Sequence, residues 1–368
     1  MICNQPPDLF DSLTNMLTKN KDFNFNELYL KFIANSKNGK RLQPNGKKLS
    51  DGTITNYTYT HKLIEDFVAY TKFELRIRSI RYLNKREMIV ESNYWARFYK
   101  KFTSYCNDTL GHYDNYVGQN IKNLRVFFNY LNRDLLLNVG EFHKKFYVRK
   151  EEIPIIALLP EELNHIIYNE ELAAKLTATQ LKAKDVFVFG CTVALRISDL
   201  QALKNTNIRT IGSEKYLLVK SKKTSTTTQV RLPEHTIAIL KKYKYKDRLL
   251  PYFNKVILNL HIKHICELAG FTNIVGKRRE KQGSAKEIKS VTKKNDALRM
   301  CDLVTTHTMR RTAITTMLCL GMPEQVVRKI SGHSPMSKEF FRYVSIAQTY
   351  QDKETEKVFD LLKEKKIG

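Results

Sequence analysis

Three segments in the first half of the chain carry mostly apolar residues three and four positions apart. Because this spacing places side chains on one face of an α-helix, each segment predicts an amphipathic helix. The three stripes are Ile54, Tyr57, His61, Ile64 and Val68; Trp95, Phe98, Phe102 and Tyr105; and Val117, Ile121, Leu124, Phe128 and Leu131. We therefore predict a mainly α fold whose first half has its own apolar core.

The chain is strongly basic. Lys and Arg outnumber Asp and Glu by 63 to 37, which gives a formal net charge of +26 over 368 residues. Such an excess favours a polyanionic partner, and nucleic acid is the commonest one. On the third predicted helix, Lys122 and Arg125 lie off the apolar stripe, where they either face DNA or belong to a solvated surface.

The cellular setting also follows from composition. No apolar stretch approaches the roughly 20 residues of a membrane span. The N-terminus lacks the basic and apolar regions of a secretory signal. Six scattered cysteines without a C-x-x-C pair fit a reducing compartment. We therefore expect a cytoplasmic protein with no membrane partner.

A domain boundary is predicted between residues 149 and 160. Lys150 to Pro154 is charged and ends on a proline, and Pro160 suits the first turn of a new helix, where its missing N–H costs nothing. We predict an N-terminal extension with a basic loop over residues 1–50, a helical domain over 51–150 and a second domain over 151–368. A further short helix is expected over residues 28–33.

The second domain is predicted to be mostly helical with a small β-sheet. The helical spacing from Val186 to Leu203 is broken at residues 194–197, which places Arg196 at a turn; Ser198 to Gln201 has the pattern of a capping box. Residues 216–232 predict a β-hairpin whose approach carries Lys220, Lys222 and Lys223. Residues 275–300 are predicted to form an exposed excursion from the domain, and a second hairpin is one of the structures open to it.

Chemistry-bearing residues gather near the C-terminus. His307 and Arg310 begin a predicted helix, and a helix N-terminus favours an anion. His333 follows the next helix at Gly332, and Tyr343 lies beside the apolar face that Phe340, Val344 and Ala347 give to the following helix. Arginines clamp phosphate, histidines move protons and a tyrosine can attack phosphorus, so the set points to chemistry on a phosphodiester.

The ordered set Arg196-Ile-Ser-Asp-Leu, His307-x-x-Arg310, Gly332-His333 and Tyr343 resembles the tyrosine recombinase (phage integrase) family, in particular integrases of bacterial mobile and conjugative elements. The resemblance covers residues 159–359. It implies a helical core-binding domain before a mixed α/β catalytic domain, and a C-shaped clamp around double-stranded DNA.

The resemblance also implies roles for single residues. Tyr343 would attack the scissile phosphate, while Arg196 and Arg310 hold its non-bridging oxygens. His307 would assist proton transfer at the tyrosine, and His333 would hydrogen-bond the phosphate. A hairpin lysine would protonate the leaving 5′-oxygen; Lys223 is favoured, with Lys222 and then Lys220 as alternatives. Tyr350 is the nearby competitor for the nucleophile, but Phe341-Arg342-Tyr343-Val344 matches the family's context better.

The resemblance predicts a site-specific recombinase that works through a Holliday junction in a tetramer on paired DNA sites, with accessory DNA-bending proteins as further candidate partners. The last helix, over residues 355–365, would dock on a neighbouring subunit. A type IB topoisomerase-like activity and a catalytically silent DNA-binding homologue remain the alternatives. No cofactor and no metal are expected; His261 and His264 are read as surface residues because no further ligand pair lies near them.

Overall fold

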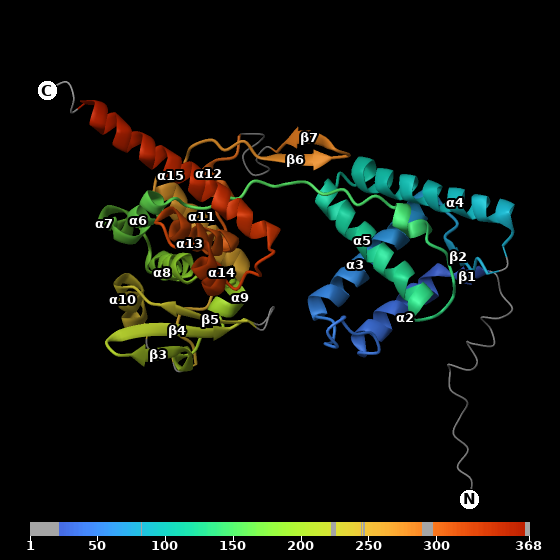
Figure 1. Cartoon of the computed structure of the whole chain (residues 1–368), viewed down its shortest axis with the longest axis horizontal. Helices are drawn as coiled ribbons and strands as arrows, with labels where there is room; N and C mark the ends of the chain where they lie inside the picture. Colours follow the sequence, from blue (N-terminus) through green and yellow to red (C-terminus); the bar gives the residue numbers. More distant parts are fainter. Residues whose placement is uncertain are drawn as a thin grey trace, which may run out of the picture. The chain divides into compact units, whose positions relative to one another are not determined.

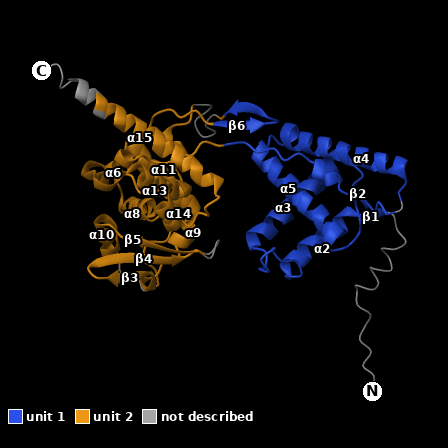
Figure 2. Cartoon of the chain, in the orientation of Figure 1, with its two compact units in different colours: residues 1–152, 278–287 blue, residues 153–277, 288–368 orange. Residues whose placement is uncertain are grey.

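The structure, a computed structural model, describes residues 22–81, 83–221, 226–243, 245, 247–288 and 297–364. It is mainly helical with small sheets, as predicted (Figure 1). The chain forms two compact units, one of residues 1–152 and 278–287, the other of residues 153–277 and 288–368 (Figure 2). The division into residues 1–50, 51–150 and 151–368 made from the sequence stays a prediction.

Before residue 152, the first unit is a helical bundle that also contains a short antiparallel strand pair, β1 with β2. Its elements before residue 152 are β1 (Asp22–Asn24), α2 (Phe25–Lys37), α3 (Asp51–Thr71), β2 (Arg76–Arg78), α4 (Lys85–Ser104), the π-helical turn η1 (Tyr105–Thr109), α5 (Asp114–Arg133) and the 3-10 turn η2 (Phe142–Lys145). The three helices predicted from apolar stripes are α3, α4 and α5. The short helix expected over residues 28–33 extends over all of α2.

Aromatic rings fill the core of this unit. Trp95 is 2% exposed and meets Phe128 edge to face, with ring centroids 4.8 Å apart. Phe98 and Phe102 stack one helical turn apart on α4. Each such ring buries on the order of 150–250 Å², which at about 25 cal/mol per Å² is several kcal/mol of hydrophobic stabilisation. The stripes seen in the sequence therefore form the core.

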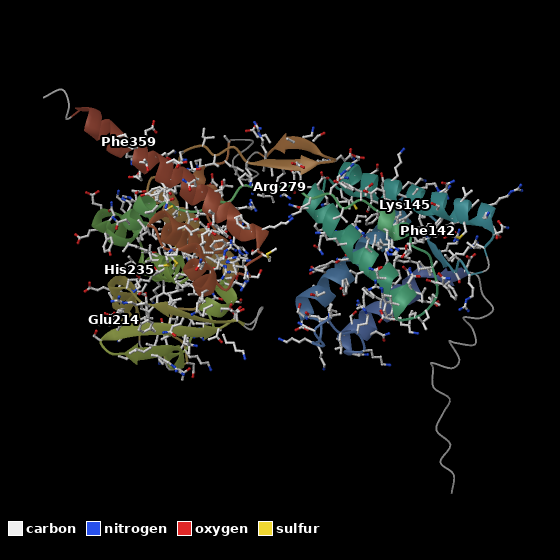
Figure 3. All side chains as sticks on the ribbon, in the orientation of Figure 1. Phe142, Lys145, Glu214, His235, Arg279 and Phe359 are labelled. Carbon is white, nitrogen blue, oxygen red and sulfur yellow. The ribbon has the colours of Figure 1, made fainter. Side chains whose placement is uncertain are left out.

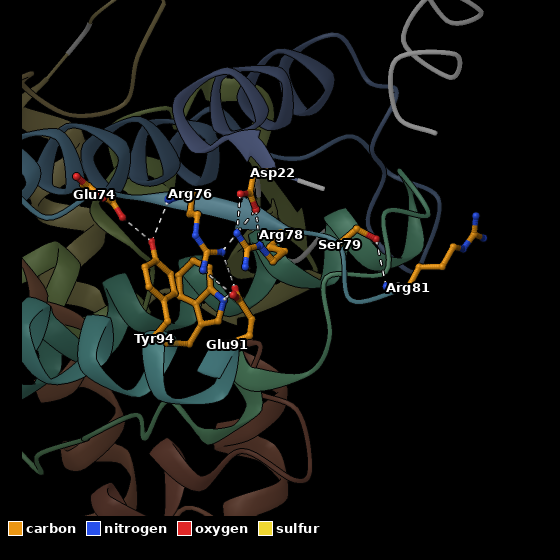
Figure 4. A network of polar contacts seen from close by, with 9 residues as sticks. Asp22, Glu74, Arg76, Arg78, Ser79, Arg81, Glu91 and Tyr94 are labelled. Carbon is orange, nitrogen blue, oxygen red and sulfur yellow. Dashed lines mark hydrogen bonds and ion pairs between the residues drawn. The ribbon is translucent and has the colours of Figure 1, made fainter. Parts of the chain in front are cut away.

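One buried carboxylate ties β2 to α4 (Figure 4). Glu91 is 1% exposed and accepts hydrogen bonds from both terminal nitrogens of Arg76, at 2.7 and 3.1 Å, and from Trp95 Nε1 at 3.0 Å. The Arg76 guanidinium also lies 4.4 Å from the centre of the Tyr94 ring. The charge is thus paired and hydrogen-bonded, which a buried carboxylate requires.

The basic loop after α2 contributes one cation to the core. The Arg41 guanidinium lies 4.3 Å from the centre of the Phe32 ring and donates a 2.7 Å hydrogen bond to Ser36 Oγ. Arg41 is therefore held by packing. On α5, Lys122 is exposed and Arg125 is half-buried.

A β-hairpin from the later part of the sequence completes the first unit (Figures 1 and 2). Strands β6 (Arg278–Lys281) and β7 (Ser284–Glu287) pair antiparallel within the excursion predicted over residues 275–300. The carboxylate of Asp114 accepts hydrogen bonds from the backbone N–H groups of Gln282 and Gly283, at 2.9 and 2.7 Å. The sequence indicated a hairpin but not where it attaches.

The second unit surrounds the buried helix α8. Its elements are α6 (Pro160–Tyr168), α7 (Glu170–Ala174), α8 (Ala178–Val193), α9 (Ile197–Leu200), the 3-10 turn η3 (Asn205–Asn207), β3 (Ile208–Ile211), β4 (Glu214–Lys220), β5 (Thr227–Arg231), α10 (Glu234–Lys242), α11 (Lys255–Leu268), α12 (Met300–Leu303), α13 (Thr306–Cys319), α14 (Glu324–Ser331) and α15 (Lys338–Glu364). The predicted hairpin is β4–β5; strand β3, which the sequence did not indicate, extends it to a three-stranded antiparallel sheet.

Close packing of α13 on α8 depends on a glycine. A Cβ at Gly190 would lie 2.6 Å from Met309 Sδ and 3.1 Å from Met309 Cβ, and Met309 is 1% exposed. The absence of a side chain at Gly190 therefore lets the two helices approach. Since Arg310 follows Met309, this approach also sets the position of the arginine.

Candidate active site

Arg196 lies at the turn between α8 and α9. Helix α8 ends at Val193, and Ala194 adopts a left-handed conformation with φ 55°, which redirects the chain. Arg196 itself is the N-cap of α9, so the capping box predicted at Ser198 is wrong in register. Its Nη1 donates to Ser221 Oγ at 3.2 Å, and Ser221 Oγ lies 3.2 Å from Asp199 Oδ2. This chain of polar contacts orients the Arg196 guanidinium.

Arg310 is held by two backbone carbonyls. From the first turns of α13, its Nη1 donates to the oxygen of Ala194 at 2.8 Å and its Nη2 to that of Ser331 at 2.6 Å. Burial, together with the nearby Arg196, lowers the pKa of Arg310 to about 10. The charged guanidinium is thus placed where an anion would stabilise it further.

His333 follows the end of α14, where Gly332 adopts φ 64° and turns the chain. Its Nδ1 lies 2.8 Å from Ser331 Oγ, and Arg310 Nη2 lies 3.4 Å from each ring nitrogen. Burial lowers the pKa of His333 to about 4, and the positive charges of Arg310, Arg196 and Arg328 act in the same direction. In the unliganded protein His333 is therefore neutral at pH 7.

Tyr343 lies on α15 beside His333. The two ring centroids are 6.0 Å apart, and Tyr343 is only 4% exposed. Its ring packs in one cluster with Phe340 and Ala347, the residues beside which the sequence places it. Burial raises the pKa of Tyr343, while Arg311 and Arg310 act against this rise. Those arginines favour the phenolate, which is the attacking form of a tyrosine.

Tyr350 has a different environment. Its hydroxyl donates to Glu161 Oε1 at 2.5 Å, and this hydrogen bond raises the pKa of Tyr350 to about 12. Because the phenol is tied to a carboxylate, it is a poor nucleophile. The contrast between the two environments favours Tyr343 as the nucleophile.

His307 lies in the first turn of α13 on its exposed side. It lines a cavity of about 250 Å³ with Arg311, Thr305 and Lys277. Desolvation lowers the pKa of His307, and Lys255 and Arg311 lower it further. The histidine is thus kept neutral and able to accept a proton.

The candidate site therefore brings together Arg196 before α9, Arg310 on α13 and His333 after α14, with Tyr343 on α15 beside His333. A family model supplies an independent comparison: the phage integrase family model matches residues 158–349, more than half of the 368 residues. The chain belongs to the phage integrase family.

Solved structures of similar fold include integrases and recombinases bound to DNA. A lambda integrase dimer bound to a COC′ core site has a TM-score of 0.57 and 11% identity, covering 92% of this chain and 83% of that one. XerH site-specific recombinase in a post-cleavage complex with palindromic difH has 0.54 and 14%, covering 87% and 81%. The Tn1549 transposon integrase with transposon right end DNA has 0.54 and 14%, covering 87% and 93%. These identities establish likeness of fold. No curated protein matched the sequence.

In this phage integrase family member, the lysine favoured from the sequence is the one predicted catalytic residue whose position the described residues do not include. Lys222 and Lys223 lie outside the described residues, between β4 and β5. Lys220 is the exposed last residue of β4 and pairs with Thr227 of β5. The structure thus locates the hairpin that carries the three lysines, and the choice of Lys223 stays a prediction.

Three supporting residues were not singled out from the sequence. Ser221 and Asp199 orient Arg196, and Ser331 contacts both Arg310 and His333. Asp199 stands three residues after Arg196 in a helical segment, so its proximity was foreseeable. Ser221 and Ser331 carried no comparable signal, because serines are common at helix ends and in loops.

Among the residues that the structure describes, no group of three or more His, Cys, Asp or Glu side chains is arranged to hold a metal ion. Within the same parts of the chain, no helix is both long enough and apolar enough to span a bilayer. His261 and His264 lie on α11, where His264 is exposed.

Proposed function

We propose that this phage integrase family member is a site-specific DNA recombinase that cuts and rejoins DNA through a 3′-phosphotyrosyl intermediate. The observation that carries the proposal is the convergence of Arg196, Arg310 and His333 around the buried Tyr343. These side chains come from distant parts of the sequence.

In the proposed reaction, the Tyr343 oxygen attacks the scissile phosphorus as the bond to the 5′-oxygen breaks. Arg310 uses one N–H of each terminal nitrogen for the carbonyls of Ala194 and Ser331, which leaves N–H groups for phosphate oxygens. Arg196 and Arg310 then stabilise the charge of the pentacovalent transition state. Because the phosphodiester bond is exchanged for a phosphotyrosyl bond, rejoining needs no external energy source.

The remaining roles are part of the same proposal. His307 accepts the Tyr343 proton, and Lys223 donates a proton to the leaving 5′-oxygen. Strand exchange proceeds through a Holliday junction in a tetramer on two DNA sites, with accessory DNA-bending proteins as further candidates. The net charge of +26 supports contact of both units with the DNA backbone. Action on DNA would place the protein in the cytoplasm.

A mobile element is the proposed context. The similar fold of an integrase solved with transposon right end DNA supports it, as does the resemblance of the motif order. The continuous helix α15 runs from Lys338 to Glu364. Residues 355–364 of the expected docking segment are therefore the distal part of this helix and not a separate one, and residue 365 lies outside the described residues. Docking on a neighbouring subunit remains part of the proposal.

A suicide substrate with a nick near the cleavage site tests the chemistry. The wild type is expected to form a covalent protein–DNA adduct, Tyr343→Phe none, and Tyr350→Phe as much as the wild type. An adduct that persists in Tyr343→Phe would overturn the nucleophile assignment. A folded wild type that gives no adduct on its element's own end sequences would favour the silent homologue.

A second assay separates recombination from simple relaxation. Two supercoiled plasmids, one with and one without paired sites from the ends of the element, are incubated with the wild type. Exchange restricted to the paired sites supports the recombinase. Relaxation of both plasmids without exchange would favour the topoisomerase-like alternative.

A further inference from the structure

The Ser331 hydroxyl lies between a helix carbonyl and the ring of His333. Its Oγ is 2.7 Å from the carbonyl oxygen of Val327 and 2.8 Å from His333 Nδ1, with the Arg328 carbonyl farther away at 3.4 Å. The Ser331 residue is 2% exposed. The hydroxyl is therefore confined to these neighbours.

A hydroxyl has one proton to share between the two short contacts. If it pointed at His333 Nδ1, the oxygen atoms of Ser331 and Val327 would face each other at 2.7 Å with no proton between them. If it points at the Val327 carbonyl, Oγ is free to accept from an Nδ1–H group. Only the second arrangement puts a proton in both contacts, and unpaired buried polar atoms are costly.

We propose that Ser331 is a positioning residue that holds neutral His333 in the tautomer with its proton on Nδ1. The lone pair then lies on Nε2. Ser331 also accepts from Arg310 Nη2 through its own carbonyl oxygen, at 2.6 Å. One residue thus orients both the histidine and the arginine of the site.

Three cations and one aromatic ring face His333. They are Arg310 on α13, Arg196 before α9, Arg328 on α14 and the Tyr343 ring on α15. Arg310 Nη2 is 3.4 Å from both ring nitrogens, so this contact does not distinguish the two tautomers. The assignment therefore rests on the Ser331 hydroxyl and its contact with the Val327 carbonyl.

The tautomer has a consequence for catalysis, which rests on the proposed function. With Nδ1–H committed to Ser331, His333 can donate to a phosphate oxygen only after Nε2 takes up a proton from solvent. The phosphate charge favours that protonation. DNA cleavage would then need the imidazolium, and the rate would fall as the pH rises through the pKa of His333 in the DNA complex.

Nitrogen NMR of the free full-length protein with ¹⁵N-labelled histidine tests the tautomer without activity. His333 is assigned by its loss in His333→Gln. We expect a protonated Nδ1 and a bare Nε2 at neutral pH in the wild type and in Ser331→Thr, which keeps the hydroxyl. Ser331→Ala should shift His333 toward the Nε2–H form. A wild-type Nε2–H form, or no change in Ser331→Ala, would overturn the proposal.

The pH dependence of adduct formation on the nicked substrate tests the consequence. The wild-type rate is expected to fall roughly tenfold for each pH unit above the pKa of His333 in the complex. Ser331→Ala should lose this fall, because neutral His333 can then donate from Nε2–H, and Ser331→Thr should restore it. Equal pH dependence in wild type and Ser331→Ala would reject the link to catalysis. A wild type without any adduct would instead reject the proposed function and leave the NMR result standing.

Discussion

Arg310 Nη2 donates a 2.6 Å hydrogen bond to the carbonyl oxygen of Ser331, two residues before His333. This bond joins α13 to the end of α14, and its companion from Nη1 to the Ala194 oxygen joins α13 to the turn before Arg196. The arginine is therefore both the proposed phosphate ligand and the structural link between three motifs. A planar guanidinium can do both because its donors are fixed in one plane.

Arg310→Lys should show whether the hydrogen bonds of the guanidinium matter in addition to its positive charge. A lysine keeps the positive charge but cannot reach both carbonyls and a phosphate, so adduct formation should fall by roughly 10²–10³-fold. Loss of the buried hydrogen bonds should cost about 1–3 kcal/mol of unfolding free energy. Rates on the nicked substrate and thermal unfolding measure the two effects. Arg209→Lys, at an exposed position on β3, is the matched control and should change neither.

His143 should make the stability of the first unit depend on pH. It is 2% exposed, its Nε2 lies 2.9 Å from Asn129 Oδ1, and burial lowers its pKa from 6.5 to about 4, with Arg125 as a further cause. Below pH 6.5 the unfolded chain binds the proton first, so stability should fall from pH 6.5 to about 4. The loss should approach roughly 3 kcal/mol.

Denaturant unfolding followed by Trp95 fluorescence measures this loss, because Trp95 is the single tryptophan and lies in the core of that unit. His143→Gln should flatten the pH dependence. His264→Gln, at an exposed position on α11, should leave it unchanged. An equally steep pH dependence in His143→Gln would show that another group is responsible.

Gly190→Ala should destabilise the second unit. The new Cβ would overlap Met309, and forcing extra volume into a packed core typically costs about 1–3 kcal/mol. A displaced α13 should also slow adduct formation, since it carries Arg310. Gly52→Ala is the control: Gly52 lies in the first turn of α3 with nothing within 4 Å of the added Cβ, so stability should stay equal or rise. Thermal unfolding of both variants decides the prediction.

Glu151→Ala should release the β6–β7 hairpin. Glu151 is 3% exposed and accepts hydrogen bonds at 2.6 Å from Arg279, labelled in Figure 3, and from the backbone N–H of Glu280. Without the carboxylate, amide hydrogen exchange across residues 278–287 should accelerate at least tenfold, because the half-buried Arg279 and the Glu280 N–H both lose their acceptor. The adjacent exposed Glu152→Ala should not change exchange there. Unchanged protection in Glu151→Ala would mean that the contacts of the hairpin with Asp114 and Asp108 are sufficient to hold it.

Helical spacing and motif order were sufficient for much of the architecture. The apolar stripes of α3, α4 and α5 predicted the first core because a 3.6-residue period leaves few other structures that bury such a face. The His307-x-x-Arg310 spacing and Gly332-His333 likewise placed the catalytic candidates at helix ends. These are local relationships, which a sequence records directly.

Contacts between residues far apart in the sequence could not be predicted from spacing and motifs. The attachment of residues 278–287 to Asp114 and Glu151 joins positions more than 120 residues apart, and nothing local to either segment specifies the other. The burial of Tyr343 could not be read from its own segment for the same reason, because residues of α13 and α14 belong to the same apolar cluster. Strand β3 was missed because its pairing with β4, rather than a period-2 pattern, stabilises it.

The sequence by itself determined the family, the helical core of the first unit and the identity of the candidate catalytic side chains, since each depends on residue types at short, regular spacing. Tertiary structure decided the hydrogen-bond partners of these side chains. Arg310 bonds the carbonyls of Ala194 and Ser331, Arg196 bonds the Ser221 hydroxyl, and His333 contacts the Ser331 hydroxyl. Those choices depend on backbone atoms and rotamers brought together from distant helices. The proposed chemistry depends on the protonation state of His333 and on the direction of the arginine N–H donors, and both are set by that packing.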